Sequence, residues 1–174
     1  PRSLAVDAAF AGLLDWLNQR AGDSLPPLRV PTVLERGGYG WAECVVAKPC
    51  THRDELVRYY QRQGAHVALM FALEATDFHH ENVIACGEYP MLIDLETVLQ
   101  PVAGSVRLAD EDSRPAAFNV LRSGLLPVRF STDPNAEGFD VSGLGGLDNP
   151  LIGGREPVNP GTDAMHYRQI QVPM

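Results

Sequence analysis

Residues 76–82 read TDFHHEN, and residues 93–96 read IDLE. The candidate functional side chains all lie within these two stretches. Asp77 and Asn82 are separated by four residues, and Asp94 follows Asn82 by twelve positions. Two carboxylates and one amide at this spacing, next to short apolar runs, indicate a site built from a loop and the end of a strand.

A short hairpin is expected between the two stretches. Residues 83–86 and 91–95 are apolar runs, and residues 87–90, GEYP, predict a tight turn between them. Because such a turn brings the two runs side by side, Asn82 and Asp94 are expected at the same edge, where both can face one ion.

The residue types at these positions are those that phosphoryl transfer needs. That reaction depends on positioning and charge neutralisation more than on covalent help. An Asp and an Asn separated by four residues are typical of the kinase catalytic loop, in which the Asp meets the hydroxyl and the Asn holds metal. Since Mg²⁺ prefers oxygen ligands, Asn82 and Asp94 are its expected ligands. Asp77 is expected to orient or deprotonate the substrate hydroxyl.

Three of these residues also have a purely structural interpretation. His79 is placed to contact the transferring phosphate, or it packs as a loop histidine against the neighbouring strand. Glu96 assists the metal site or caps the turn that follows it. Asp77 comes after a helix and a threonine, which is also a common way to begin a loop. The joint spacing of Asp77, Asn82 and Asp94 favours the functional interpretation.

Lys48 and the glycines at 37, 38 and 40 are weaker candidates. Lys48 follows VVA, which is similar to the segment that carries the phosphate-binding lysine of kinases. Only 29 positions separate it from Asp77, so a connection between two lobes is expected here, with a backbone contact to adenine. The glycines do not form G-x-G-x-x-G, and they predict a turn.

The residues before this polar stretch alternate between helix and strand signals. Apolar residues at helical spacing predict an amphipathic helix over 4–20, and strands are expected at 28–35 and 41–47. A second helix is expected from 51 to about 74, with a capping signal at its start. Its inward-facing residues are predicted to be Leu56, Tyr60, Val67 and Phe71.

The last part of the chain differs in composition from the rest. Residues 101–174 contain 9 Gly and 8 Pro and show few periodic segments. One short helix or turn is expected near four apolar residues, and the rest is expected to be a long ordered loop or an incomplete subdomain. The four are Val120, Leu121, Leu125 and Leu126.

Composition restricts the classes of function. The 174 residues are 45% hydrophobic and carry a formal net charge of −8. The acidic balance argues against nucleic-acid binding, and no apolar run is long enough for a membrane span. Three cysteines without a C-x-x-C pair predict reduced thiols and a cytoplasmic location, while His79, His80 and Cys86 are a poor tetrahedral set for zinc. Because the chain begins at Pro1, it is expected to be a fragment of a longer protein.

Six short runs resemble the dehydratase domain of class II lanthipeptide synthetases, the LanM type. They occur in the order found in that family and extend over most of the chain. The runs that contain DFHHEN and IDLET are the specific ones, because the glycine-rich runs alone are weak signals. The six are residues 1–4 (PRSL), 36–41 (RGGYGW), 76–82 (TDFHHEN), 93–97 (IDLET), 121–127 (LRSGLLP) and 140–145 (DVSGLG).

The resemblance implies a kinase-like fold that uses ATP and Mg²⁺ to phosphorylate Ser and Thr of a ribosomal precursor peptide with a leader. Elimination of phosphate then leaves dehydroamino acids. By the family's motif, Asp77, His79 and Asn82 form the catalytic-loop set, Asp94 is the metal carboxylate, and Glu96 lies beside it. The nucleotide lysine, the elimination residues and the zinc-dependent cyclase of such a synthetase are expected outside these residues.

These observations predict an α+β, kinase-like chain, with part of the small lobe at 1–48 and the front of the large lobe at 49–174. On their own, the 174 residues are expected to be inactive or nearly so. Two alternatives remain open. One is a small-molecule phosphotransferase of the aminoglycoside-kinase type, whose loop also has D-x-H-x-x-N. The other is a nucleotide-binding pseudoenzyme that docks peptide.

Overall fold

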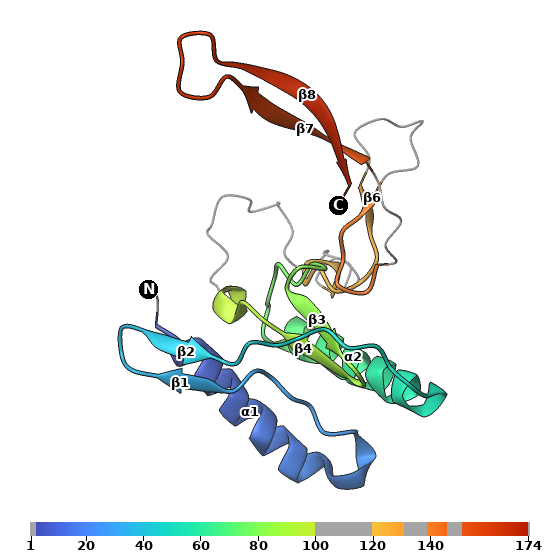
Figure 1. Ribbon diagram of the computed structural model, residues 1–174. Helices are drawn as coiled ribbons and strands as arrows, with labels where there is room; N and C mark the ends of the chain where they lie inside the picture. Colours follow the sequence, from blue (N-terminus) through green and yellow to red (C-terminus); the bar gives the residue numbers. More distant parts are fainter. Residues whose placement is uncertain (1–2, 100–119, 131–138, 146–150, 174) are drawn as a thin grey trace, which may run out of the picture. The chain divides into compact units, whose positions relative to one another are not determined.

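The computed structural model describes residues 3–99, 120–130, 139–145 and 151–173 (Figure 1). Helices and small antiparallel sheets alternate along these ranges, which confirms the mixed α+β class. The chain divides into two compact units. The first comprises Pro1–Val128 with Val141–Gly145, and the second comprises Arg129–Asp140 with Gly146–Met174. In the described ranges, no helix is both long and apolar enough to cross a membrane.

The first unit begins with helix α1, Ala5–Ala21, which confirms the first predicted helix. Its buried residues are Phe10 and Leu14, and a single 3-10 turn, η1 (Gly22–Ser24), follows it. Strands β1 (Val33–Glu35) and β2 (Gly40–Ala42) then pair antiparallel around the glycine turn.

Both of these strands are shorter than predicted. Pro26, Pro27 and Pro31 lack the N–H that a strand ladder requires, so the first strand starts only at Val33. After β2 the chain leaves this sheet and crosses to another hairpin, where Lys48 forms a parallel bridge with Cys86.

Helix α2, Arg53–Ala72, confirms the second predicted helix, but the prediction of its inward face is wrong. Leu56, Tyr60 and Phe71 are 46%, 58% and 42% exposed, and only Val67 packs against the core. The helix instead buries a mostly polar face, which consists of Arg62, Gln63, His66 and Met70. Apolar spacing identifies a stripe along a helix, whereas the neighbouring elements determine which stripe is covered.

Arg62 explains why this face of α2 turns inward. Its side chain is buried, and its Nε donates to the carbonyl oxygen of Pro27 at 2.8 Å. Its Nη1 donates to the carbonyl oxygen and to Oε2 of Glu88, at 2.9 and 3.0 Å. The guanidinium lies 4.1 Å from the ring centroid of Tyr89. One side chain therefore joins α2 to the segment after α1 and to the hairpin described next.

The hairpin between the two polar stretches has the predicted position. Strands β3 (Val83–Cys86) and β4 (Tyr89–Leu92) pair antiparallel, with Val83 opposite Leu92. A 3-10 turn, η2 (Leu95–Thr97), follows β4. Side chains from the helices, the hairpin and the later segment form one core cluster, of which the most buried members are Leu14, Met70, Phe78, Leu92, Leu95 and Leu125.

Residues 120–128 form turns, as predicted, and residues 129–173 contain more strand than predicted. Strands β5 (Arg129–Phe130) and β6 (Phe139–Asp140) pair with each other, and so do β7 (Leu151–Val158) and β8 (His166–Pro173). The long-loop alternative is therefore wrong for 151–173, where the alternating sequence RQIQV at 168–172 was the missed strand signal, and the alternative of an incomplete subdomain remains a prediction. Residues 101–119 lie outside the described ranges, and the predicted lobe boundary at residue 48 remains a prediction.

His66 leads to a testable pH dependence. It is fully buried, and neither ring nitrogen has a hydrogen-bond partner within the described ranges. Burial, assisted by the charge of Arg62, lowers the pKa of His66 from 6.5 to about 4. Between these values the unfolded chain binds a proton that the folded chain does not, so stability is expected to decrease as the pH falls. Once the pH has fallen through both pKa values, the free energy of unfolding is expected to be lower by about 3 kcal/mol.

Urea unfolding of wild type and His66→Leu at a series of pH values measures this contribution. The Glu88 carboxylate, whose pKa is held low chiefly by Arg58 and also by Arg62, adds acid sensitivity to both proteins. Only the difference between the two therefore reports on His66, and the wild type is expected to lose more stability than the variant. Equal losses would show that the buried imidazole does not contribute.

Candidate active site

The polar loop, residues 76–82, is closed by its own hydrogen bonds. The side-chain amide of Asn82 donates through Nδ2 to the carbonyl oxygen of Asp77 at 2.8 Å. The backbone N–H of Asn82 donates to the carbonyl oxygen of His79 at 2.9 Å. Asp77 adopts a left-handed backbone conformation with φ of 69°. These bonds hold both ends of the loop together and leave Oδ1 as the acceptor end of the Asn82 amide.

Asn82 and Asp94 lie at the same end of the β3–β4 hairpin, as the turn between the strands predicted. Val83 lies opposite Leu92 in the last strand pair. The hydrogen bonding extends one residue further on each side, because Ile93 N–H donates to the carbonyl oxygen of Asn82 at 3.0 Å. Asp94 follows directly, exposed and left-handed with φ of 58°. Non-glycine residues in this conformation are uncommon and are concentrated at functional sites, although Asp tolerates it better than most.

The donor atoms at this end of the hairpin fit Mg²⁺ better than zinc. Asn82 and Asp94 provide an amide oxygen and a carboxylate, while Mg²⁺ usually keeps several waters and phosphate oxygens as its other ligands. A closed protein cage is not formed, because the described residues contain no group of three or more His, Cys, Asp or Glu side chains suited to a metal. The role of Asn82 and Asp94 as ligands remains a prediction.

His79 is oriented by its neighbour in the loop. The backbone N–H of Glu81 donates to Nδ1 of His79 at 3.2 Å, so a neutral His79 carries its proton on Nε2. That Nε2 lies 3.6 Å from Oδ1 of Asp77, and both side chains are accessible to solvent. Asp77 and His79 thus form a pair in which Nε2 of the imidazole lies just beyond hydrogen-bond distance of the carboxylate.

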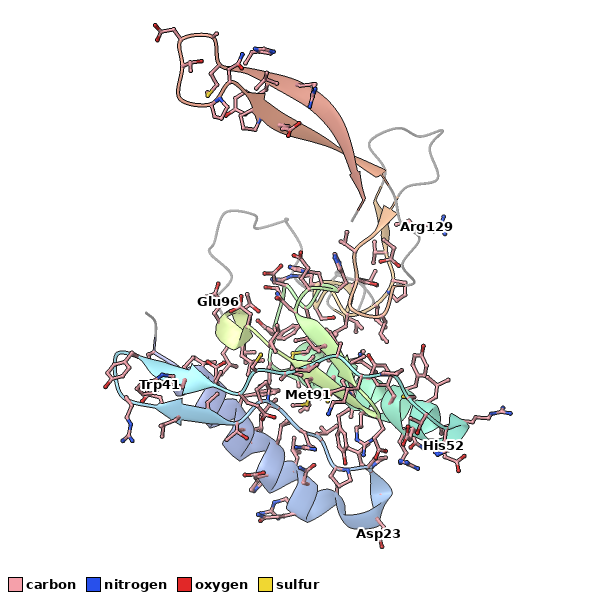
Figure 2. All side chains as sticks on the ribbon, in the orientation of Figure 1. Asp23, Trp41, His52, Met91, Glu96 and Arg129 are labelled. Carbon is pink, nitrogen blue, oxygen red and sulfur yellow. The ribbon has the colours of Figure 1, made fainter. Side chains whose placement is uncertain are left out.

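Glu96 lies on η2, one residue beyond the start of that turn (Figure 2). The next residue, Thr97, donates from its hydroxyl to the carbonyl oxygen of Thr76, which ties η2 to the start of the polar loop. The hairpin end and the loop start are therefore connected directly. The role of Glu96 beside the metal site remains a prediction.

Two later segments pack against the polar loop, and no role for them was predicted from the sequence. We call residues 120–128 and 141–145 the loop brace. Phe78 N–H donates to the carbonyl oxygen of Ser123 at 2.8 Å, and His80 N–H donates to that of Val141 at 3.0 Å. The repeated SGL at 123–125 and 142–144 was the available signal, since small residues permit close approach of two backbones.

A cavity of about 260 Å³ lies between the segment after β2 and the β3–β4 hairpin. Its lining is mostly apolar or sulfur-containing and includes Val45, Val46, Cys86 and Met91, the last of which is marked in Figure 2. Lys48 also lines it. However, the backbone N–H and carbonyl of Lys48 are already bonded to Ala85 and Gly87. These two bonds fix the backbone of Lys48 on the hairpin, and the backbone contact with adenine at this position remains a prediction.

The whole chain, residues 1–174, matches the model of a family described as Domain of unknown function (DUF4135). The chain belongs to the DUF4135 family. It is also 30% identical over 189 residues to the Lacticin 481/lactococcin biosynthesis protein LcnDR2 of Lactococcus lactis subsp. lactis. The alignment covers 99% of the chain and 19% of that relative, so this DUF4135 chain spans about a fifth of the relative's length. The resemblance to lanthipeptide synthetases is confirmed at the level of homology.

Proposed function

We propose that this DUF4135 chain carries the phosphotransfer site of a peptide-modifying synthetase with a kinase-like fold. The observation that carries the proposal is the arrangement of three residues. The side-chain amide of Asn82 donates a hydrogen bond to the backbone carbonyl of Asp77. Asn82 directly precedes the β3–β4 hairpin, and Asp94, with its left-handed backbone, follows the hairpin by two residues. Homology to a lacticin 481 biosynthesis protein supports a peptide as the substrate.

In the proposed reaction, the hydroxyl oxygen of a Ser or Thr in a precursor peptide forms a bond to the γ-phosphorus of ATP. The bond from that phosphorus to the bridging oxygen breaks, and ADP leaves. Asp77 accepts or orients the hydroxyl proton, and His79 contacts the transferring phosphate. Asn82 and Asp94 would hold Mg²⁺, which supplies neutralisation of the phosphate charge when bound. Glu96 is assigned to the same nucleotide–metal contact.

The second half of the proposed function is elimination. Removal of the Cα proton from the phosphorylated residue, with cleavage of the Cβ–O bond, releases phosphate and forms the double bond of a dehydroamino acid. We assign no residue of this chain to that step. The proposed partners are a ribosomal precursor peptide with a leader and further domains of the synthetase, including a zinc-dependent cyclase. The proposed location is the cytoplasm, which supplies ATP and keeps thiols reduced.

Mass spectrometry of a candidate precursor peptide tests the proposal. The peptide is incubated with Mg²⁺ and the full-length protein that contains this chain, with ATP and, as a control, with a non-hydrolysable ATP analogue. ATP-dependent loss of water at Ser or Thr is the expected result. Retained phosphate on the peptide would support the transfer step and contradict the elimination step.

An unchanged peptide, together with ATP consumption that depends on a small molecule, would overturn the proposal in favour of a small-molecule phosphotransferase. An unchanged peptide that nevertheless binds the protein, without nucleotide turnover, would favour a docking pseudoenzyme. The isolated 174 residues are expected to show little or no turnover, and activity comparable to that of the longer protein would contradict this expectation.

A further inference from the structure

His80 makes two hydrogen bonds to one atom of the loop brace. Its backbone N–H donates to the carbonyl oxygen of Val141 at 3.0 Å, and its ring Nδ1 lies 3.1 Å from the same oxygen. Because a carbonyl oxygen only accepts, Nδ1 of His80 must carry the proton. The two neighbouring histidines therefore have opposite roles at Nδ1, since that of His79 accepts from Glu81.

The same region of the loop is held on its other side by Ser123. Phe78 N–H donates to the carbonyl oxygen of Ser123, so the residues before and after His79 are both bonded to the loop brace. His79 itself lies opposite Ser142 in an antiparallel bridge. His79 is thus fixed at the backbone by contacts on three consecutive residues.

The two parts of the loop brace are also hydrogen-bonded to each other, and they pack tightly against Phe78 of the polar loop. Gly143 N–H donates to the carbonyl oxygen of Gly124 at 2.9 Å, and Leu144 N–H donates to that of Leu125 at 2.9 Å. A methyl group on Gly143 would lie 2.7 Å from the carbonyl oxygen of Phe78. Such a contact is too short, so this close approach requires glycine.

We propose that the loop brace positions the Asp77–His79 pair, and that His80 is the positioning residue that links the two. This inference rests on the proposed function, because it assigns the loop brace a role in the same phosphotransfer site. His80 does not contact substrate. Its two hydrogen bonds to the carbonyl oxygen of Val141 fix the backbone next to His79, and thereby the direction of the His79 ring toward Asp77.

The test compares His80→Leu with His80→Asn in the full-length protein. Leucine removes the side-chain bond to Val141, whereas the Nδ2 of asparagine can take the place of Nδ1. His80→Leu is expected to lower kcat for ATP-dependent phosphate transfer roughly 10- to 100-fold, with little change in KM for ATP. His80→Asn is expected to recover most of kcat. Equal activity of the two variants would overturn the inference.

Hydrogen exchange followed by mass spectrometry provides a measurement that does not need activity. Peptides covering residues 76–82 are expected to exchange faster in His80→Leu and in Gly143→Ala, while peptides from α1 stay unchanged. Gly38→Ala is the matched control, since nothing lies within 4 Å of the added methyl group there. Slow exchange at 76–82 in both variants would overturn the role of the loop brace.

The two measurements also separate this inference from the proposed function. If the wild type transfers no phosphate, the proposed function fails, while the exchange data still report whether His80 and Gly143 hold the loop. If phosphate transfer occurs and exchange at 76–82 is unaffected by His80→Leu, only the positioning inference fails.

Discussion

Replacing Asp94 with asparagine is expected to lower ATP- and Mg²⁺-dependent phosphorylation of the peptide by roughly 10²- to 10³-fold. The variant removes the negative charge that the proposed magnesium site requires next to Asn82. Asparagine has nearly the same shape and is among the residues that best tolerate the left-handed backbone found at Asp94. The fold is therefore expected to stay intact, and single-turnover phosphate transfer in the full-length protein measures the effect.

Asp23→Asn is the matched control for Asp94→Asn. It makes the same change of charge on the exposed turn η1 beyond the end of α1 (Figure 2). Its phosphate transfer is expected to equal that of the wild type, and the unfolding temperatures of both variants are expected to match the wild-type value. Metal-dependent turnover that persists in Asp94→Asn would contradict the assigned role, and unchanged biological activity without turnover would favour a docking protein.

Replacing Arg62 with alanine is expected to lower the free energy of unfolding by about 4 kcal/mol. The change leaves the carbonyl oxygens of Pro27 and Glu88 without their buried donor, and it also removes the packing of the guanidinium on Tyr89. The Arg62 side chain is itself buried, and the variant loses its hydrogen bonds and its packing together, which is why the effect exceeds that of an ordinary exposed ion pair. Urea unfolding of the wild type and the variant at neutral pH measures the difference.

Arg58→Ala separates the buried network from the ion pair at its edge. Arg58 also pairs with Glu88, but its side chain is 41% exposed, so its removal is expected to destabilise the chain far less than that of Arg62. Arg62→Lys is expected to recover only part of the loss, because an ammonium group lacks the planar fork that reaches several acceptors. Equal destabilisation by Arg58→Ala and Arg62→Ala would show that the buried contacts contribute little.

Features with a local physical cause could be predicted from the sequence. The two helices follow from apolar spacing together with their terminal residues, and the β3–β4 hairpin follows from two apolar runs around a short turn. The approach of Asn82 to Asp94 followed as well, because a two-stranded hairpin brings its flanking residues together whatever surrounds it. The family resemblance also rested on such short runs.

The loop brace could not be predicted in this way. Ser123 and Val141 lie more than 40 positions after the residues that they bond, and the interaction uses backbone carbonyl oxygens, which every residue has. Only the paired glycines carried a signal, and glycine is equally consistent with an ordinary turn. The β7–β8 hairpin was missed for a related reason, since Pro and Gly residues interrupt its strand pattern.

The sequence by itself determined the elements of the first unit and the polar residues at the loop and the hairpin end, because propensity and turn chemistry act over a few residues. The tertiary structure alone decided which face of α2 is buried, since Arg62 finds its partners at Pro27 and Glu88, far away in the chain. It likewise decided how Asp77 and His79 are oriented, because the segments that hold their loop are brought there only by folding.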